Sequence, residues 1–498
     1  MTCSSDDLFS NGMREFLQTN VGAYPLHTHC FGDILNRRLC ARLESDDLLA
    51  ESKAPVGTGG SPSAGKIRHY IKSILKKPNA EECDVLFLSR YRPINIDGAA
   101  GFKTDYLFNS VINEVNRSNR HPGMALVCTG GHGDVYTDRR VTNFSLFEFL
   151  SLRILLKSVI RSVLLRLKYR RIANRLSAVQ KKMFDESLSF SSLLFYHLLD
   201  FCLSKTISSL KPKVVVANDD VLIFKPSTNH HFQLVVLQSA LITEQIERHK
   251  NLLFSSFLED RLLSDYFCVS GSLAESLKRK YLKDTRNLVM TGQPRFDNLA
   301  KADELFDKDE ICRRLGLIGD RRILVWATET HALPLEENRE NVEAICAAVK
   351  SLENVGLVVK LHPAEDQDAP LYKENRSCTP IIVKGSENIS ESLFVCDAMI
   401  TKSSTAAIEA AILDKPVIVL NLSGEPDIIP YVKEGVALGV YEKKDLVPAI
   451  RQALYDEKIR ENLAKQREKF VYEYAYIQDG KASERVANLI LRLAGKAE

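Results

Sequence analysis

From residue 84 onward the chain alternates short apolar runs with longer stretches of helical pattern, and this alternation most constrains its fold. The runs are rich in Val, Ile and Leu and show no regular polar alternation. They therefore predict strands buried on both faces, as in a parallel sheet that has helices on each side. Alternation with helices predicts βαβ units and an α/β class. The runs are 84–89, 124–130, 213–219, 233–238, 266–271, 288–292, 322–328, 356–361, 380–385, 397–402 and 415–420.

The length of the chain indicates that these strands belong to two domains. A single hydrophobic core stops growing near about 250–300 residues, and this chain has 498. We expect two sheets of similar size. The predicted organisation is an N-terminal extension over 1–80 with a Gly-, Ser- and Pro-rich flexible linker at 51–66, a first Rossmann-like domain over 81–285, and a second over 286–498 that ends in a helical tail.

The composition argues against several classes of protein. A net charge of +3 gives no support to a nucleic-acid partner. The first residues lack the basic and apolar regions of a secretory signal, and no apolar stretch of about 18 residues is free of charge. The 11 cysteines are dispersed without a C-x-x-C pair, so we expect reduced thiols. These features predict a cytoplasmic protein without a transmembrane helix.

Residues 149–184 form a segment with many Lys and Arg residues and no acidic residue. Arg153, Lys157 and Arg161 recur every four residues, so on a helix they share one face. Two interpretations stay open: a basic amphipathic helix on an anionic membrane surface, or a solvated face of an ordinary packing helix. A groove for an anionic polymer is compatible with the second. The segment lacks the interleaved aromatic residues typical of single-strand nucleic-acid binding.

The segment DAMITKSSTAAIEAAILDKPVIVL, at 397–420, predicts a strand, a turn, a helix and a strand. Ser403, Ser404 and Thr405 fall where the helix starts, and capping needs only one hydroxyl. A helix N-terminus at the carboxyl end of a parallel strand is a place where anions bind. Three hydroxyls there predict a phosphate site. Glu409, about one and a half turns further on, is either a ribose contact or a surface glutamate.

The stretch GLVVKLHP, at 356–363, ends a predicted strand in His362 and Pro363. A histidine just beyond a strand tip is placed to contact phosphate and to stabilise charge on a leaving group. The proline restricts the backbone of His362 to extended conformations, which directs the ring. Capping of a surface turn is the alternative. The hydroxyl-rich helix start in the same βαβ series favours the functional interpretation.

Two further loops end strands of the same predicted sheet, at the edge where ligands bind in this architecture. Thr328 and His331 follow the strand 322–328, and Arg295, which could pair with phosphate, follows 288–292. A D-x-D pair at Asp366 and Asp368 is expected by chance in a polar loop. The predicted donor-binding residues are Arg295, Thr328, His331, His362, Ser403, Ser404, Thr405 and Glu409, with no metal.

Three motifs, GQPRFDNL, VVKLHP and DAMITKSSTAAIEAAILDKPVIVLN, in this order and spacing, resemble the nucleotide-binding half of GT-B glycosyltransferases. The most similar group carries an HP motif and a later SS or ST motif. It includes CDP-glycerol glycerophosphotransferases of teichoic-acid synthesis, bacterial capsule sialyltransferases and Kdo transferases, and UDP-GlcNAc 2-epimerases share its fold. The resemblance covers residues 285–480. It implies two Rossmann-like domains that face each other across a cleft, with His362 and the hydroxyls at 403–405 contacting the donor.

The resemblance also implies that the base that activates the acceptor comes from the N-terminal half. Where a glycerophosphotransferase would show His-Gly after the strand 233–238, this chain reads QSAL, and the acidic residues of the epimerases are absent as well. Asp97, Asp219 and Asp220 are the candidate catalytic bases. A turn role for Asp97 and a helix N-cap role for the Asp219–Asp220 pair stay open.

The sequence thus predicts a metal-independent transferase that needs no cofactor. It would move a sugar or polyol phosphate from a CMP-, CDP- or UDP-linked donor to a lipid-linked or anionic glycan acceptor. The expected process is synthesis of surface polysaccharide, glycolipid or a teichoic-acid-like polymer. We expect peripheral attachment to the inner face of the cell membrane through 149–184. The alternatives are a nucleotide-sugar 2-epimerase and a non-catalytic nucleotide-sugar-binding protein.

Overall fold

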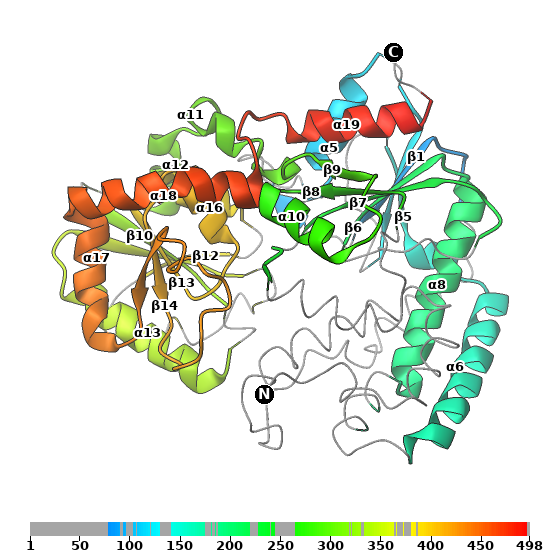
Figure 1. The fold of residues 1–498 in the computed structure, drawn as a ribbon, viewed down its shortest axis with the longest axis horizontal. Helices are drawn as coiled ribbons and strands as arrows, with labels where there is room; N and C mark the ends of the chain where they lie inside the picture. The colour runs from blue at the N-terminus through cyan, green and yellow to red at the C-terminus, as the bar shows by residue number, and fades with distance from the viewer. Residues whose placement is uncertain are drawn as a thin grey trace.

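The computed structural model describes residues 78–495 with gaps, of which the longest are 130–140, 220–227 and 245–263. Its strands form two parallel sheets with helices on both faces (Figure 1). The first sheet has the order β5-β4-β1-β6-β7-β8-β9. Its strands are β1 (Val85–Ser89), β4 (Met124–Cys128), β5 (Val141–Ser145), β6 (Val214–Asn218), β7 (Gln233–Leu237), β8 (Tyr266–Val269) and β9 (Leu288–Met290), and its helices are α5 (Asn109–Arg117), α6 (Leu152–Ala173), α8 (Phe190–Leu210), α10 (Ser272–Tyr281) and α19 (Ala482–Leu493).

The second sheet has the order β12-β11-β10-β13-β14-β15, again with parallel pairs throughout. Its strands are β10 (Arg322–Ala327), β11 (Val355–Lys360), β12 (Ile381–Val383), β13 (Ala398–Thr401), β14 (Val417–Leu420) and β15 (Ala437–Val440). Its helices are α11 (Ala302–Leu305), α12 (Lys308–Leu315), α13 (Leu335–Lys350), α15 (Ile389–Val395), α16 (Ala406–Ile412), α17 (Leu446–Tyr455) and α18 (Glu457–Ala475).

Both sheets are buried on both faces, as the continuous apolar runs predict. In β1, Leu86 and Leu88 pack into one core while Val85 and Phe87 pack into the core on the opposite face. Successive side chains of a strand point to opposite sides, so a strand between two helical layers must be apolar at every position. β10 follows the same rule with its own pair of cores. The predicted α/β class is confirmed.

Every apolar run expected to be a strand lies in one of the two sheets. The sequence analysis missed β5 and β15, which are edge strands, and a small antiparallel pair, β2 (Pro93–Asn95) and β3 (Lys103–Asp105). β5 carries the polar residues Thr142 and Asn143 in its middle. An edge strand has one neighbour and is less enclosed, so its sequence does not need a continuous apolar run.

The division between the domains differs from the predicted boundary at 285/286. β9, which begins at Leu288, is the last strand of the first sheet. The chain then builds the second domain and returns, because Val486 and Ile490 of α19 pack in the same core as Val85 of β1. The C-terminal helix therefore covers the first sheet beside α5, at the top of Figure 1. The helical character of the tail is as expected, although its last helix belongs to the first domain.

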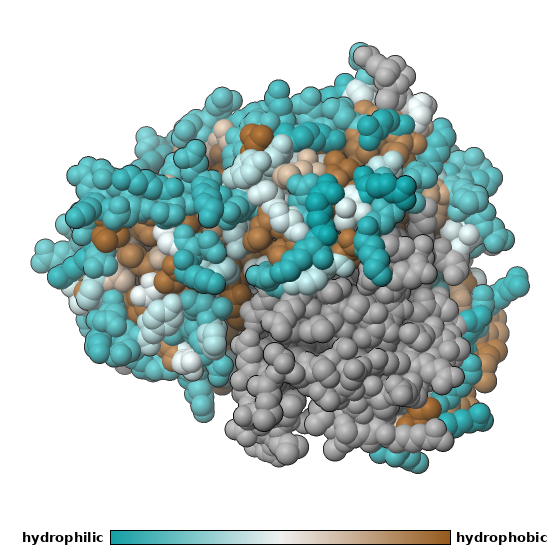
Figure 2. Space-filling model, in the orientation of Figure 1, coloured by the Kyte–Doolittle hydropathy of each residue, from teal (hydrophilic) through white to brown (hydrophobic). Residues whose placement is uncertain are grey.

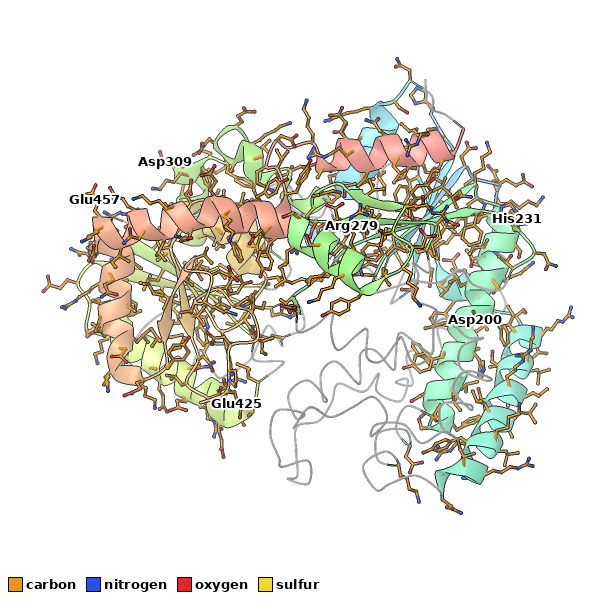
Figure 3. The ribbon with its side chains drawn as sticks, in the orientation of Figure 1. Asp200, His231, Arg279, Asp309, Glu425 and Glu457 are labelled. Atoms are coloured by element: carbon orange, nitrogen blue, oxygen red, sulfur yellow. The ribbon has the colours of Figure 1, made fainter. Side chains whose placement is uncertain are left out.

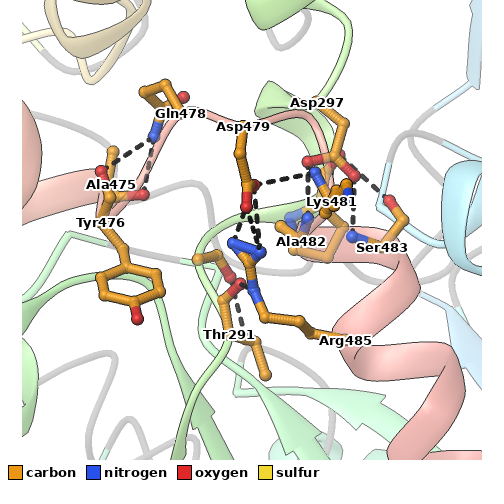
Figure 4. Close-up of polar contacts among 12 residues, drawn as sticks. Thr291, Asp297, Ala475, Tyr476, Gln478, Asp479, Lys481, Ala482, Ser483 and Arg485 are labelled. Carbon is orange, nitrogen blue, oxygen red and sulfur yellow. Dashed lines mark hydrogen bonds and ion pairs between the residues drawn. The ribbon is translucent and has the colours of Figure 1, made fainter.

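Polar contacts hold this returning segment against the linker that follows β9 (Figure 4). The carboxylate of Asp297 accepts hydrogen bonds from the backbone N–H groups of Ala482 and Ser483, at 2.9 and 2.7 Å, and so satisfies free donors in the first turn of α19. Arg485 donates to the carbonyl oxygen of Thr291 at 3.0 Å and pairs with Asp479. These contacts fix the linker after β9 to the first turn of α19.

Gly271 marks the place where α18 reaches the first domain. A Cβ atom at this residue would lie 2.3 Å from the backbone oxygen of Glu473, near the end of α18. Only glycine permits so close an approach of two backbones. The nearby Ser270 hydroxyl donates to the carbonyl oxygen of Tyr474 at 3.1 Å. α18 therefore bridges the two domains by direct backbone contact.

The basic segment predicted as a helix over 149–184 is shorter in the structure. A 3₁₀ helix covers Leu146–Phe149, and α6 begins at Leu152 because the Ser151 hydroxyl caps it by accepting from the N–H of Ile154. α6 ends at Ala173 and packs along α8. Across the described parts of the chain, no helix has the length and apolar character needed to cross a bilayer. Most of the predicted extension over 1–80, including the linker at 51–66, lies outside the described residues.

Candidate functional site

The carboxyl ends of β11, β10 and β13 meet at one edge of the second sheet, because these strands are parallel neighbours in that order. The residues that follow them are His362 after β11, Thr328 and Glu329 after β10, and Ser403 after β13. This edge is where ligands bind in open α/β sheets. The structure thus brings together three of the loops that the sequence analysis selected.

The loop after β13 directs its donors at one carboxylate. Ser403 donates its backbone N–H to Oε1 of Glu329 at 2.8 Å and its hydroxyl to Oε2 at 2.6 Å. Thr401 donates its hydroxyl to Oε1 at 2.7 Å. The sequence analysis did not select Glu329, and it assigned the Ser403 hydroxyl to a phosphate. The donors of this loop therefore converge on an anionic group, which in this structure is supplied by the chain itself.

The other two hydroxyls of the SST sequence differ in their contacts. Ser404 caps the helix start, because its hydroxyl oxygen accepts from the N–H of Ala406 at 3.3 Å. Its carbonyl oxygen accepts from the hydroxyl of Tyr431 at 3.0 Å. Burial raises the pKa of Tyr431 far above its ordinary value, so it stays a neutral donor. Thr405 precedes α16 and makes no side-chain capping bond. One hydroxyl of the three therefore satisfies an N–H at the helix start, and it belongs to Ser404, the residue before the N-cap Thr405.

Glu409 is buried beneath this loop rather than exposed. It is 4% exposed, so the surface-glutamate alternative is wrong. Its Oε2 accepts from the Ser390 hydroxyl at 3.2 Å, and its Oε1 lies 3.9 Å from Nη1 of Arg295. Burial raises the pKa of Glu409, against the opposing effects of Arg295, Ser390 and Lys360. Arg295 was predicted to follow a strand of the same sheet, but β9 belongs to the first sheet, so that placement is wrong. Arg295 nevertheless lies beside Glu409, a carboxylate of the second domain.

Lys360 is a second buried charge that the sequence analysis did not select. It is 4% exposed, and its ammonium group donates to the carbonyl oxygens of Leu361 and Lys384, at 2.9 Å each. Burial lowers the pKa of Lys360 to about 8, which nearby carboxylates partly oppose. Its signal in the sequence is a lysine inside the otherwise apolar run GLVVKL. It places a buried cation directly before the His362 loop.

The backbone of His362 is held from both sides. Its N–H donates to the hydroxyl oxygen of Thr328 at 3.1 Å, and its carbonyl oxygen accepts from the N–H of Glu365 at 3.0 Å. The hydroxyl of Thr328 in turn donates to Oε2 of Glu365 at 2.7 Å. Thr328, predicted as a donor contact, is thus engaged within the protein.

The candidate bases are less well defined. Asp97, Asp220 and also His331 lie outside the described residues. Asp219 follows β6, and its Oδ1 accepts from both the backbone N–H and the hydroxyl of Ser239, at 2.8 and 2.6 Å. It therefore braces the exit of the neighbouring strand β7. Whether any of the three aspartates acts as a base stays a prediction.

Gln238 occupies the position after β7 at which the resemblance implies His-Gly. It is buried, and its side-chain oxygen accepts from the backbone N–H of Ser270 at 3.0 Å. Its backbone carbonyl oxygen accepts from the side-chain amide of Gln293 at 2.9 Å. Gln238 thus links β7 and β8 with the segment that enters the second domain. In the described residues, no group of three or more His, Cys, Asp or Glu side chains could hold a metal ion.

Known structures with a similar fold include two groups of enzymes. The UDP-GlcNAc 2-epimerase from Neisseria meningitidis, bound to UDP-GlcNAc, is 13% identical with a TM-score of 0.50, covering 82% of this chain and 99% of its own. A variant of the wall teichoic acid polymerase TagF is 12% identical with a TM-score of 0.49, covering 86% and 97%. The first similarity confirms the predicted GT-B fold. No curated protein matches the sequence.

A family comparison reaches beyond the fold. Residues 208–492, more than half of the chain, match the model of a family described as CDP-glycerol:poly(glycerophosphate) glycerophosphotransferase. The match includes the last strands of the first sheet and the whole second domain. It confirms the predicted class of nucleotide-activated transferase. The chain belongs to the CDP-glycerol:poly(glycerophosphate) glycerophosphotransferase family.

Proposed function

We propose that this protein transfers glycerol phosphate, or a closely related polyol phosphate, from a CDP-linked donor to a growing anionic polymer. The observation that carries the proposal is the convergence of the His362, Glu329 and Ser403 loops at one sheet edge, within the region that matches the family. CDP is the nucleotide that the family description favours among the CMP-, CDP- and UDP-linked donors expected from the sequence. The similarity to the epimerase, at 13% identity, supports only the fold.

The reaction is a displacement at phosphorus. The oxygen of an acceptor hydroxyl forms a bond to the phosphorus that bears the glycerol, and the bond from that phosphorus to the bridging oxygen breaks. CMP leaves with the electron pair of that bond, and the hydroxyl proton passes to a base in the first domain, for which Asp97, Asp219 and Asp220 are the candidates. Such a transfer depends mainly on positioning and on stabilising phosphate charge. We propose that it needs no metal and no cofactor.

His362 and the loop after β13 act on the donor in this mechanism. His362 lies beyond β11, where a ring N–H can donate to the phosphate that becomes the leaving group. The hydroxyls and N–H groups at 403–405 supply neutral donors to the same charge. Glu409 and His331 complete the predicted contacts to the nucleotide. These donors can exert their effect when charge moves onto the bridging oxygen.

The experiment that tests this function measures release of CMP from CDP-glycerol with and without a poly(glycerophosphate) acceptor. Acceptor-dependent release that falls at least about 100-fold in His362→Ala supports the proposal. A transferase needs both substrates, an epimerase consumes no acceptor, and a non-catalytic binding protein releases no CMP while still binding CDP. The variant Glu457→Gln serves as the control, because Glu457 is exposed at the start of α18, away from the sheet edge of the proposed site (Figure 3).

We further propose that α6 holds the enzyme on an anionic membrane surface, near a lipid-linked acceptor. The helix has three faces. Small and apolar residues, including Ser158, Ser162 and Leu165, are buried on the side of α8. An adjacent row is apolar but exposed, and consists of Leu152, Leu156, Ile160, Val163, Leu164 and Leu167.

Cations flank this exposed apolar row. Arg153, Lys157 and Arg161 follow Leu152, Leu156 and Ile160 by one residue each, and all three are exposed, so the cationic and apolar rows run side by side along the helix. Apolar and polar side chains lie next to each other over α6 at the lower right of Figure 2. An apolar stripe bordered by cations suits the boundary between anionic headgroups and acyl chains. The surface thus favours the membrane interpretation over a merely solvated basic face, which would need no exposed leucines.

A further inference from the structure

Glu365 closes a ring of hydrogen bonds around the backbone of His362. The ring runs from the N–H of His362 to the hydroxyl of Thr328, from that hydroxyl to the carboxylate of Glu365, and from the N–H of Glu365 back to the carbonyl oxygen of His362. The distances are 3.1, 2.7 and 3.0 Å. Each backbone polar group of His362 therefore has a partner that depends on Glu365.

The carboxylate of Glu365 is itself held in place. Tyr372 donates its hydroxyl to the same Oε2 at 3.2 Å, and the ring of Tyr372 packs edge-on against Trp326 of β10, with centroids 5.6 Å apart. Glu365, Thr328 and Tyr372 are 8%, 2% and 3% exposed. A buried carboxylate needs such donors, since leaving it without partners is costly. The ring of hydrogen bonds around His362 is thus anchored on strand β10 as well as on the loop.

The direction of the Thr328 hydroxyl decides how the ring works. A hydroxyl has one proton, and Oε2 of Glu365 at 2.7 Å is a better acceptor than the carbonyl oxygen of Lys360 at 3.3 Å. When the Thr328 hydroxyl donates its hydrogen bond to Glu365, a lone pair of its oxygen faces the N–H of His362. Glu365 therefore fixes the orientation in which Thr328 can hold His362.

We propose that Glu365 is a positioning residue for His362, acting through Thr328 and through its own backbone. The proposal rests on the function proposed above, in which His362 contacts the donor phosphate. Glu365 does not touch the donor in this role. It fixes the strand-to-loop turn from which the imidazole projects, so that the ring meets the bridging oxygen when charge develops there. Misplacing a catalytic group by about 1 Å can reduce the rate by about 100-fold.

Two pairs of variants test this role. Thr328→Val removes the hydroxyl at nearly unchanged volume, and Thr328→Ser keeps the hydroxyl but loses a methyl group. Glu365→Leu removes the acceptor, and Glu365→Gln keeps a carbonyl oxygen that can accept from Thr328. We expect kcat to fall by about 10- to 100-fold in Thr328→Val and Glu365→Leu. In Thr328→Ser and Glu365→Gln it should stay within about threefold of the parent, because an acceptor chain is retained.

A binding measurement separates positioning from general damage. The single tryptophan, Trp326, contacts Tyr372, so its fluorescence reports on the local fold of each variant, and isothermal titration measures donor binding. We expect the Kd for CDP-glycerol to change by less than about threefold in all four variants, since Glu365 acts through His362 on the transition state. Equal losses of kcat in Thr328→Val and Thr328→Ser, or losses confined to donor binding, would overturn the proposal.

Three outcomes keep this inference separate from the proposed function. If His362→Ala retains full turnover, the role of His362 fails and the positioning role with it. If His362→Ala is inactive but Thr328→Val and Glu365→Leu turn over normally, only the positioning role fails. If Glu365→Leu does not fold, Tyr372→Phe removes one donor to the carboxylate without touching the Thr328 link, and the Thr328 pair still decides the result.

Discussion

Ser403 gives both its backbone N–H and its hydroxyl to the carboxylate of Glu329, at 2.8 and 2.6 Å. These are donors that a diphosphate at this sheet edge would also use. A carboxylate and a phosphate cannot share them without repulsion between like charges. If the donor phosphate binds at this edge as proposed, the contact opposes its binding, and the size of this effect can be measured.

Glu329→Gln should strengthen donor binding. The amide oxygen can still accept from the loop, so the loop keeps its shape, while the negative charge beside the phosphate is lost. We expect the Kd for CDP-glycerol to fall by about three- to tenfold, which corresponds to about 1 kcal/mol. Isothermal titration of this variant, of the parent and of Glu457→Gln, which neutralises an exposed carboxylate at the start of α18, checks the prediction. Weaker binding in Glu329→Gln would show that the carboxylate braces the loop and does not oppose the donor.

The pair formed by Arg295 and Glu409 predicts an asymmetry in stability. Both side chains are largely buried, with Nη1 and Oε1 3.9 Å apart. Arg295→Met leaves a buried carboxylate without its cation and should lower the free energy of unfolding by about 3 kcal/mol. Glu409→Gln leaves the guanidinium of Arg295 without its carboxylate, but the amide keeps an acceptor oxygen for Ser390, and Arg295 is the more exposed partner, at 12% against 6%, so it should cost only about 1 kcal/mol. Urea unfolding followed by Trp326 fluorescence distinguishes the two values.

The matched control for this pair is the exposed ion pair between Arg286 and Asp284. Arg286→Met should leave the free energy of unfolding nearly unchanged, because solvent screens a surface pair. Equal effects of Arg295→Met and Arg286→Met would contradict the view that Arg295 compensates a buried charge.

The fold could be predicted largely because its strands are enclosed. A strand such as β1 or β10 has helices on both faces, so every position must be apolar, and the pattern is visible in the sequence. β5 was missed because an edge position relaxes that demand and admits the polar residues Thr142 and Asn143. β15 has the short sequence ALGV, in which a glycine weakens the strand pattern. The return of α19 to the first sheet could not be foreseen, since its pairing with Val85 is a contact between distant parts of the chain.

The candidate site was predicted where its residues follow strands, and missed where residues contact one another across loops. His362 and Ser403 stand directly after apolar runs, so parallel topology alone brings them to one edge. Glu329 and Glu365 are acidic residues in polar loops, which locally resemble any surface residue. Their importance comes from partners on other strands, Ser403 and Thr328, and no local pattern encodes those contacts.

Two buried groups between α6 and α8 should give opposing pH dependences of stability. Burial raises the pKa of Asp200 to about 6, against Lys157 and Arg161, and burial with Arg161 lowers the pKa of His197 to about 4. Between about pH 4 and 6 the folded chain keeps the Asp200 proton that the unfolded chain has released, so this group disfavours folding as pH rises. From about pH 6.5 down to 4 only the unfolded chain protonates His197, so that group disfavours folding as pH falls.

Single variants should separate these two effects, which nearly cancel in the parent. Asp200→Asn should stabilise the protein at pH 7 by up to about 3 kcal/mol and leave a melting temperature that falls below pH 6.5. His197→Gln should leave the opposite slope, with a melting temperature that falls as pH rises from 4 to 6. Thermal unfolding across this pH range checks both curves. Asp200 lies on α8, far from the sheet edge at which we propose that the donor binds (Figure 3), so CDP-glycerol affinity should stay unchanged.

The surface of α6 predicts membrane binding that needs both charge and apolar contact. Replacing Arg153, Lys157 and Arg161 by Gln should weaken binding to vesicles with anionic lipid by about 100-fold, at about 1 kcal/mol for each cation. The same effect should be reproduced in the parent by high salt, which screens these charges. Leu156→Ser with Ile160→Ser should weaken binding by at least tenfold at any salt concentration, since burial of exposed apolar area is lost.

The control replaces Arg451, Lys458 and Lys465, exposed cations of α17 and α18, and should leave cosedimentation unchanged. If the control weakens binding as much as the α6 variant, the attraction is general and α6 is not the attachment site. If neither α6 variant changes binding, the exposed leucines serve another purpose and the protein does not dock through this helix.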